Sequence, residues 1–523
     1  MWPALERSRL LQLYRSGMGG QDQPRDTGER MDTYIDDVRR RDENYFNLPP
    51  ALFDKLGPDE FTMLLENVSD CHSVGKWCQS SREQDKLCRL NNVYQRLFDR
   101  RVAEGTWRPR LLPTDWSSDG MPYRHEFIFQ CTAVEMGTDS GQTPSIKGLW
   151  SDYYKTFAFT QPLEAVHGDA YAFSNLIRNN NLDCQMVILH EGTTLIPPVG
   201  FYGLENLQKV FNMDAVTEIG EHAFFRCSKL ALTRLPAGLT STGEYAFQGC
   251  TSLALTALPD DLTSIGDASF MGCSLLALTT LPAGLMSIGD YTFFGCRKLA
   301  LTTLPDGLTA IGVQAFYECP KLALTELPAD LTSIGAYAFA NCSKLALTRL
   351  PPRLTSISDS TFSGCSTLAL TELPVDLRSI GAYAFFRCSK LALTTLPPHL
   401  TSIGDATFSG CSKLALTELP ADLTSIGKYA FAHCSKLALT TLPAGLTEIR
   451  EYTFAGCTLL ALTELPAPVQ QRTGLTSIGE YAFANCRNLR LKTLPPSIER
   501  IAPNAFSGSR YSTDMIRRLF NNR

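Results

Sequence analysis

The sequence predicts an α+β repeat fold, in which a small helical module precedes a solenoid of about 14 repeats of 23 residues. Three observations support this prediction: cysteines at a fixed spacing, a phenylalanine three residues before each of them, and a Leu-Pro pair in each interval. Eleven of these cysteines lie 23 residues apart: Cys227, Cys250, Cys273, Cys296, Cys319, Cys342, Cys365, Cys388, Cys411, Cys434 and Cys457. Cys486 follows after 29 residues, because about six residues are inserted around Pro468–Thr473, and Ser509 takes the next position.

Each repeat divides into two segments of different character. An isoleucine, an alanine, a phenylalanine and the cysteine fall at i, i+4, i+5 and i+8, which is one face of a helix, so we expect a single helical turn there. The segment Leu345–Leu347 alternates as a strand does, and Pro351 ends it. One unit buries too few apolar side chains to offset the ordering of its 23 residues. The copies are therefore expected to stack and to share their faces.

Composition narrows the class of protein. Lys and Arg number 48 and Asp and Glu 53, a net charge of −5, which argues against a broadly basic nucleic-acid binder. No apolar run reaches 18 residues, so no membrane span is expected. Residues Met1–Gly19 lack the apolar centre and cleavage site of a secretory signal. With an odd total of 17 cysteines, the chain is expected to hold reduced thiols in the cytoplasm, or in the host cytoplasm if it is viral.

The repeat unit resembles the BspA-like leucine-rich repeat, a Leu/Ile strand ending in Pro and followed by Ile-Gly-x-x-Ala-Phe-x-x-Cys. The likeness covers about three fifths of the chain and recurs in every copy. This chain departs from the family in one respect, since it reads Leu-x-Leu-x-x-Leu where the family more often has Leu-x-x-Val-x-Ile. The resemblance implies a leucine-rich-repeat solenoid over residues 191–509 that offers an extended surface to a macromolecule and has no enzymatic activity.

Alternate repeats differ from each other, so the sequence also has a second period of 46 residues, or two repeats. The position seven residues after the cysteine alternates between glutamate and other residues, and an aspartate often follows four residues later. We expect a column of charges along one face of the solenoid, which would bind a protein partner. The expected partner-binding residues are Arg234, Glu326, Asp330, Arg349, Glu372, Asp376, Glu418, Asp422 and Glu464. The alternative is the duplication of a two-repeat cassette without selection on these positions.

The N-terminal third does not repeat. Residues 1–44 are rich in Gly, Arg and Asp and predict a disordered lead-in, residues 45–104 a small helical module, residues 105–190 a mixed connector, and residues 510–523 a C-terminal cap helix. Within the connector, Phe127–Phe129 and Met186–Leu189 suggest strands and Ala170–Ile177 a helix.

The module over 45–104 resembles an F-box-like domain of the kind found beside repeat arrays in large DNA viruses and protists. Leu48-Pro49, the segment Phe61–Val68, Trp77-Cys78, Cys88 and Tyr94–Phe98 carry the likeness. The resemblance implies that Leu48, Pro49, Leu52, Phe61 and Leu65 form the face that docks a Skp-type adaptor of a cullin ubiquitin ligase. The alternative is that these residues are simply the core of a helical bundle.

No catalytic or metal-binding motif is recognisable. The sequence has no phosphate-binding loop, no Gly-x-Gly-x-x-Gly after a strand, no His-Glu-x-x-His and no Gly-x-Ser-x-Gly. Each repeat supplies one cysteine beside Phe and Leu, whereas a zinc site needs clustered donors, so the cysteines are expected to be buried apolar thiols. No cofactor is expected. The hypothesis of an enzyme within residues 105–190 has the least support.

The sequence therefore predicts a non-enzymatic protein–protein interaction protein without nucleic-acid or membrane partners. The most specific version of this prediction is a substrate receptor for ubiquitin ligation, in which the F-box-like module binds the adaptor and the repeats bind the target. The alternative is a cell-surface adhesin or host-interaction protein of the BspA type, which would require an export signal.

Overall fold

The computed structural model describes residues 134–137, 147–151, 155–159, 172–467, 474–511, 515, 516 and 518. The chain divides into two units. One unit holds residues up to Pro162 together with Ile177–Glu191 and Val210–Asn212, and the other holds the remainder. The F-box-like module, the lead-in and Phe127–Phe129 lie outside the described residues. Residues 512–514, 517 and 519–523 also lie outside them, so the C-terminal helix and the domain boundaries stay predictions.

The first unit contains a five-stranded sheet in the order β1-β2-β3-β4-β6. Its strands are β1 (Val134–Gly137), β2 (Lys147–Ser151), β3 (Thr156–Phe159), β4 (Met186–Ile188) and β6 (Lys209–Phe211). The first three strands pair antiparallel, whereas β3 and β4 pair in parallel, and the helix α9 (Ala172–Asn179) lies between these two in sequence. Phe157 and Phe159 are buried and contact each other edge to face at 4.9 Å. The strand and the helix expected near 186–189 and 170–177 are confirmed.

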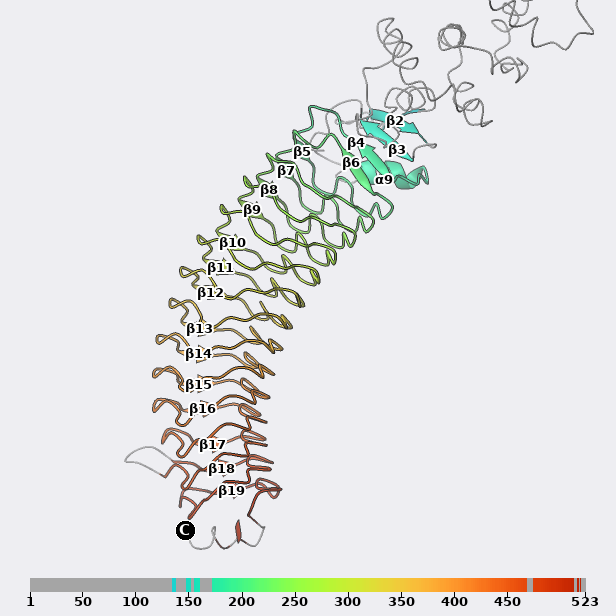
Figure 1. Cartoon of the computed structure of the whole chain (residues 1–523). Helices are drawn as coiled ribbons and strands as arrows, with labels where there is room; N and C mark the ends of the chain where they lie inside the picture. Colours follow the sequence, from blue (N-terminus) through green and yellow to red (C-terminus); the bar gives the residue numbers. More distant parts are fainter. Residues whose placement is uncertain are drawn as a thin grey trace, which may run out of the picture. The chain divides into compact units, whose positions relative to one another are not determined.

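The second unit is a β-solenoid, in which each turn contributes one strand of two residues (Figure 1). The strands are β5 (Leu195–Ile196), β7 (Glu218–Ile219), β8 (Ser241–Thr242), β9 (Ser264–Ile265), β10 (Ser287–Ile288), β11 (Ala310–Ile311), β12 (Ser333–Ile334), β13 (Ser356–Ile357), β14 (Ser379–Ile380), β15 (Ser402–Ile403), β16 (Ser425–Ile426), β17 (Glu448–Ile449), β18 (Ser477–Ile478) and β19 (Arg500–Ile501). These 14 strands enclose about 13 turns of roughly 23 residues.

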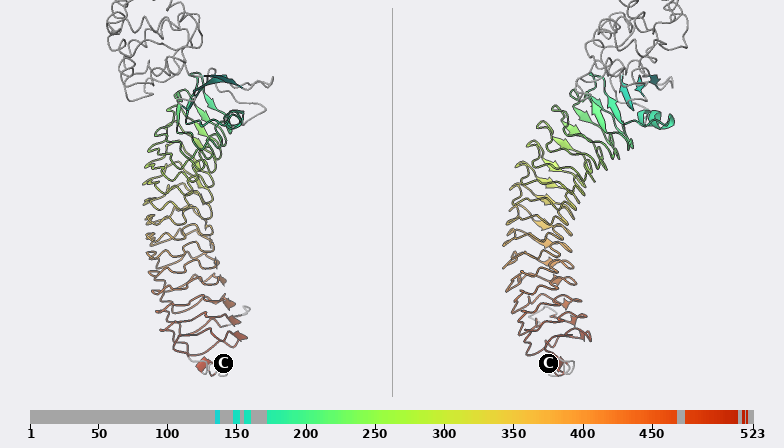
Figure 2. Two further views of the ribbon diagram at one scale, coloured as in Figure 1. Left: turned by 90° about the vertical axis from the view of Figure 1, so that its right-hand side faces the viewer. Right: turned by 45° about the vertical axis from the view of Figure 1, so that its right-hand side comes forward.

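The strands form four parallel sheets along one side of the stack, as Figure 2 shows. The pairing register equals one repeat, so that Ser379 faces Ser402 and Ile380 faces Ile403. The sheets are β5-β7-β8-β9, β10-β11-β12, β13-β14-β15-β16 and β17-β18-β19. The isoleucines are buried except for Ile501 in the last strand, which is half-buried, whereas the serines beside them are exposed or half-buried. Stacking of identical turns thus produces a ladder of identical side chains.

The α+β description of the repeat is wrong in two details, and both have one cause. The strand is the Ser-Ile pair rather than the Leu-Ala-Leu segment, and the Tyr-Ala-Phe segment is a series of turns rather than a helical turn. Residues five and one before each cysteine have positive φ, as at Tyr383 (57°) and Arg387 (59°), which no α-helix allows. Backbone N–H groups consequently bond to the next turn, for example Phe385 N to Thr407 O at 2.9 Å.

Phenylalanine and cysteine form the centre of every turn. Fourteen phenylalanines from Phe201 to Phe506 stack with ring centroids 5.1–5.8 Å apart and planes within 21° of parallel. Each of the twelve repeat cysteines is buried and donates its thiol to the phenylalanine carbonyl of the preceding turn at 3.0–3.2 Å. The predicted buried thiols are confirmed, and their role is to join successive turns.

The solenoid packs closely at one position, seven residues before the cysteine, and glycine occupies it in most turns. A Cβ on Gly404, seven residues before its cysteine, would lie 2.5 Å from the backbone N of Ala382 in the preceding turn. Gly404 N donates to Ile380 O at 3.2 Å, and this bond continues the strand ladder. Among the described residues, no helix is long and apolar enough to cross a membrane.

Candidate functional site

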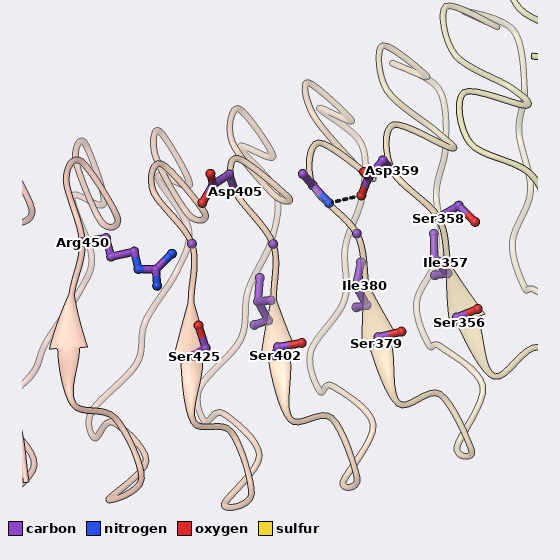
Figure 3. A pocket seen from close by; sticks show the side chains of 15 residues that line it. Ser356, Ile357, Ser358, Asp359, Ser379, Ile380, Ser402, Asp405, Ser425 and Arg450 are labelled. Atoms are coloured by element: carbon purple, nitrogen blue, oxygen red, sulfur yellow. Dashed lines mark hydrogen bonds between the residues drawn. The ribbon is translucent and has the colours of Figure 1, made fainter. Parts of the chain in front are cut away.

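A groove of about 520 Å³ runs along the outer side of β13–β16 (Figure 3). Its floor carries the serine hydroxyls of four successive strands, Ser356, Ser379, Ser402 and Ser425, which lie in a row in Figure 3. Neighbouring parallel strands lie about 4.8 Å apart, so the row spans about 14 Å. The groove therefore offers evenly spaced hydroxyl groups, each able to donate and to accept a hydrogen bond.

The two ends of the groove coincide with two departures from the glycine rule. Ser358 and Arg450 occupy the position that holds glycine in the turns between them. At Ser358 the hydroxyl donates to Ile334 O at 3.0 Å, where a glycine N–H would otherwise continue the ladder. The sheets end at these same turns, between β12 and β13 and between β16 and β17. A third boundary, between β9 and β10, falls at a turn with Gly289, so a side chain at this position accompanies two of the three boundaries. The groove lies over the sheet between Ser358 and Arg450.

Charged groups lie at both ends of the groove. Asp359 and Asp405 each accept a backbone N–H of the following turn, from Ala382 at 2.7 Å and from Lys428 at 2.7 Å. Arg450 donates its Nε to Glu448 at 2.7 Å. Figure 3 shows Asp359 at one end and the Arg450 guanidinium at the other, directed toward the turn of Ser425. The groove is polar and has a carboxylate at one end and a cation at the other.

The buried repeat thiols are not reactive groups. Burial raises the pKa of the Cys342 and Cys486 thiols to about 12, and it raises the pKa of Cys365 and Cys388 well above the usual range. These thiols stay protonated at neutral pH and do not reach the surface, so they are poor nucleophiles. In the described part of the chain, no three His, Cys, Asp or Glu side chains come together as a metal site would require.

The predicted partner-binding charges lie elsewhere on the solenoid. Arg234, Glu326, Asp330, Arg349, Glu372, Asp376, Glu418, Asp422 and Glu464 are all exposed, and they precede the strand of their turn. Arg349 lies 3.6 Å from Glu326, and Arg353 lies 3.2 Å from Asp330, so the basic turn neutralises the acidic turn before it. None of the nine lines the groove. Their role in binding stays a prediction.

Sequence reasoning missed the serine row and the two ends of the groove. The signal was present, because Ser358 and Arg450 are the two internal turns in which the residue seven before the cysteine is not glycine. Recognising its meaning required the knowledge that this position touches the preceding turn. The adaptor-binding residues Leu48, Pro49, Leu52, Phe61 and Leu65 lie outside the described residues.

The repeats match the model of the BspA type leucine-rich repeat region in six copies, over residues 169–279, 269–392 and 378–513. The match covers more than half of the chain, and the chain therefore belongs to the BspA-type leucine-rich repeat proteins. Solenoids of this kind are typical of non-enzymatic interaction proteins and of surface repeat proteins.

Three solved structures are similar to this chain, and the first of them supports the fold. A leucine-rich repeat protein from Bacteroides ovatus is 23% identical, with a TM-score of 0.51, and the match covers 71% of this chain and 98% of that one. A leucine-rich cell surface protein from Faecalibacterium prausnitzii is 22% identical over 64% of this chain and 96% of that one, with a TM-score of 0.37. The leucine-rich repeat protein of T. pallidum is 31% identical over 34% of this chain and 78% of that one, with a TM-score of 0.26. No curated protein matches the chain.

Proposed function

We propose that this chain is a non-enzymatic protein-interaction protein whose solenoid binds an extended segment of a partner along the β13–β16 groove. The observation that supports it is the row of four serine hydroxyls bounded by Ser358 and Arg450. A row about 14 Å long matches roughly four residues of extended chain. Its hydroxyls pair with backbone or side-chain amides, and Arg450 pairs with a carboxylate of the partner.

The stacked turns make this surface rigid before it binds. Each turn is joined to the next by backbone bonds, by a thiol and by a stacked ring, so little conformational entropy is lost in the groove on association. A preorganised groove therefore binds a short segment more tightly than a mobile loop of the same composition would. The partner loses its own freedom, which keeps the binding reversible.

Affinity purification followed by mass spectrometry tests this proposal. The whole chain is compared with Arg450→Gly, which restores the residue of the neighbouring turns and removes the cation. We expect the partner recovered with the whole chain to fall by about tenfold with Arg450→Gly, because a charged anchor is lost. Arg378→Thr, which restores the common residue one position before the strand, serves as a control of equal charge change. The proposal fails if both variants recover the same partner as the unchanged protein.

Two cellular settings are compatible with this function. In the cytoplasmic setting, residues 45–104 bind a Skp-type adaptor and bring the bound target to a cullin ligase; the sequence resemblance of that segment supports it. In the second setting the chain is a surface adhesin, which the BspA-type family supports. Deleting residues 45–104 abolishes co-purification of an adaptor in the first setting. In the second, the solenoid is reached by protease added to intact cells.

A further inference from the structure

The turns from Cys227 to Cys296 carry an unbroken row of acidic residues. In each of these four turns the residue six before the cysteine is acidic, whereas in the next four turns Asp359 alone is acidic at that position. The four residues are Glu221, Glu244, Asp267 and Asp290, of which the first three are exposed and the last is half-buried. Neighbouring turns repeat at the strand spacing of about 4.8 Å, so the row spans about 14 Å.

The chain compensates this negative charge only in part. Glu221 Oε1 lies 3.1 Å from His222 Nδ1, and one oxygen of Asp267 and one of Asp290 each accept a backbone N–H of the following turn. Among the ion pairs of the described residues, none joins a Lys or an Arg to any of the four. The segments 221–226, 244–249, 267–272 and 290–295 contain four acidic residues and one basic residue, Arg226. The row therefore keeps an excess of negative charge.

Half-buried aromatic rings alternate with these carboxylates along the same turns. The four rings are Phe225, Tyr245, Tyr291 and Phe294. The first two contact His222, with centroids 5.4 and 4.8 Å apart, and the last two contact each other at 6.3 Å. Ala268, in the turn between the two pairs, is only 1% exposed, so neighbouring side chains cover it. We call the four carboxylates and the four rings the acidic–aromatic edge.

The chain itself shows which cation packs on such rings. The Arg226 guanidinium lies over the Phe225 ring at 5.2 Å, and in a later turn Arg387 lies over Phe386 at 4.9 Å. A planar guanidinium stacks on an aromatic ring and pairs with a carboxylate through two donors, whereas a lysine ammonium is a strongly hydrated point charge. In the other three turns of the edge, glycine replaces this arginine. The edge is therefore complementary to arginine side chains of a partner.

We propose that the acidic–aromatic edge binds an extended, arginine-rich segment of a partner protein. Side chains on one face of an extended segment repeat every 6.8 Å or so, which means that three alternate arginines span about 14 Å, the length of the acidic row. This inference rests on the proposed function, that the solenoid binds proteins, and adds a second surface and the chemical class of its partner. The edge and the groove are separate surfaces, since no residue of the edge lines the groove.

The test measures binding of the full chain to short labelled peptides by fluorescence anisotropy. One peptide carries three arginines at alternate positions, and a second carries lysines in their place. We expect the arginine peptide to bind at least about fivefold more tightly. The double variant Glu221→Gln, Glu244→Gln weakens it by about tenfold, because two carboxylates of the edge are lost. The matched control Glu372→Gln, Glu418→Gln removes two exposed carboxylates elsewhere and keeps the affinity within about twofold.

An added arginine tests the edge without removing any of its groups. Gly272 has a φ of 75°, and Arg226 and Arg387 have φ of 57° and 59° at the equivalent position, so Gly272→Arg is expected to fold. It weakens the arginine peptide by about tenfold, whereas Gly410→Arg, the same change in a turn outside the edge, has an effect below about twofold. Equal affinity for both peptides, equal losses in the two double variants, or indifference to Gly272→Arg overturns the inference. If partner recovery still depends on Arg450 in that case, the proposed function stands.

Discussion

The inner and outer sides of the solenoid are made by the same 23-residue turns, yet they follow different periods. Inside, Phe and Cys recur in every turn from Cys227 to Cys486, because each turn must satisfy the carbonyls and fill the space of its neighbour. Outside, Glu326, Glu372 and Glu418 recur in every second turn, and so do the exposed Tyr337, Tyr383 and Tyr429. The difference teaches that packing between turns fixes the inner residues in every turn, whereas exposed residues of this kind are available for recognition.

The largest expected effect is a loss of folding stability at high pH, which acts through the buried thiols of the inner side. Burial raises the pKa of eleven repeat thiols above the value they have in the unfolded chain. Unfolded thiols lose their protons above about pH 9 and folded ones do not, so stability falls as pH rises from about 9 to 12. Each thiol contributes about 1.4 kcal/mol per pH unit. Urea midpoints measured from pH 7 to 10.5 check this; a flat profile contradicts it.

Substitution of one ring of the phenylalanine ladder is expected to have the next largest effect. Phe362 is fully buried and stacks on Phe339 at 5.7 Å and on Phe385 at 5.6 Å. Phe362→Ala leaves a cavity that the repeated backbone cannot close, and it lowers the free energy of unfolding by about 3–5 kcal/mol. Urea unfolding followed by circular dichroism measures the loss. A cost below 1 kcal/mol would show that the turns do not depend on the ladder.

Substitutions at the glycine position compare the stability of a turn inside the groove, at Gly404, with that of a turn at its end, at Ser358. Gly404→Ala is expected to cost about 1–3 kcal/mol, because its Cβ meets the backbone of the preceding turn. Ser358→Gly is expected to cost less, since the ladder bond of the glycine turns can replace the hydroxyl bond to Ile334. Thermal unfolding of both variants decides the order. The reverse order contradicts the close packing of Gly404 against the preceding turn.

Removal of a single thiol has a smaller expected effect. Cys365 Sγ donates to Phe339 O at 3.1 Å, but this carbonyl also accepts from the backbone N of Cys342 at 3.1 Å. Cys365→Ala therefore leaves no unpaired carbonyl and is expected to cost about 1 kcal/mol. It also reduces the slope of stability against pH above pH 9 by the share of one thiol. An unchanged slope would mean that Cys365 titrates alike in both states.

Substitutions on the outer side are expected to change the free energy of unfolding least. Arg349 and Glu326 are exposed and lie 3.6 Å apart, a geometry that contributes little in water. Glu326→Gln is expected to change the free energy of unfolding by less than about 0.5 kcal/mol, and high salt should remove even that difference. Urea unfolding at 50 mM and 500 mM salt measures it. A large loss would place this column among the residues that hold the turns together.

Sequence reasoning located the repeat and its buried residues but not the strand. The positions of Ile380, Ala384, Phe385 and Cys388 match one helical face, and local periodicity has no further information. The positive φ at Tyr383 and Arg387 turns the backbone bonds toward the next turn instead. For the same reason, the groove was not foreseen, because Ser358 and Arg450 matter only through the turns that they touch.

The 23-residue period, the buried Phe and Cys and the membership of a repeat family were determined by the sequence alone, since each turn must carry its own share of a common core. The tertiary structure decided which residues form the strands, where the sheets end and which side chains meet on the surface. These features depend on bonds and contacts between residues about 23 apart, and no local pattern contains them. The surface that meets a partner exists only once the turns are stacked.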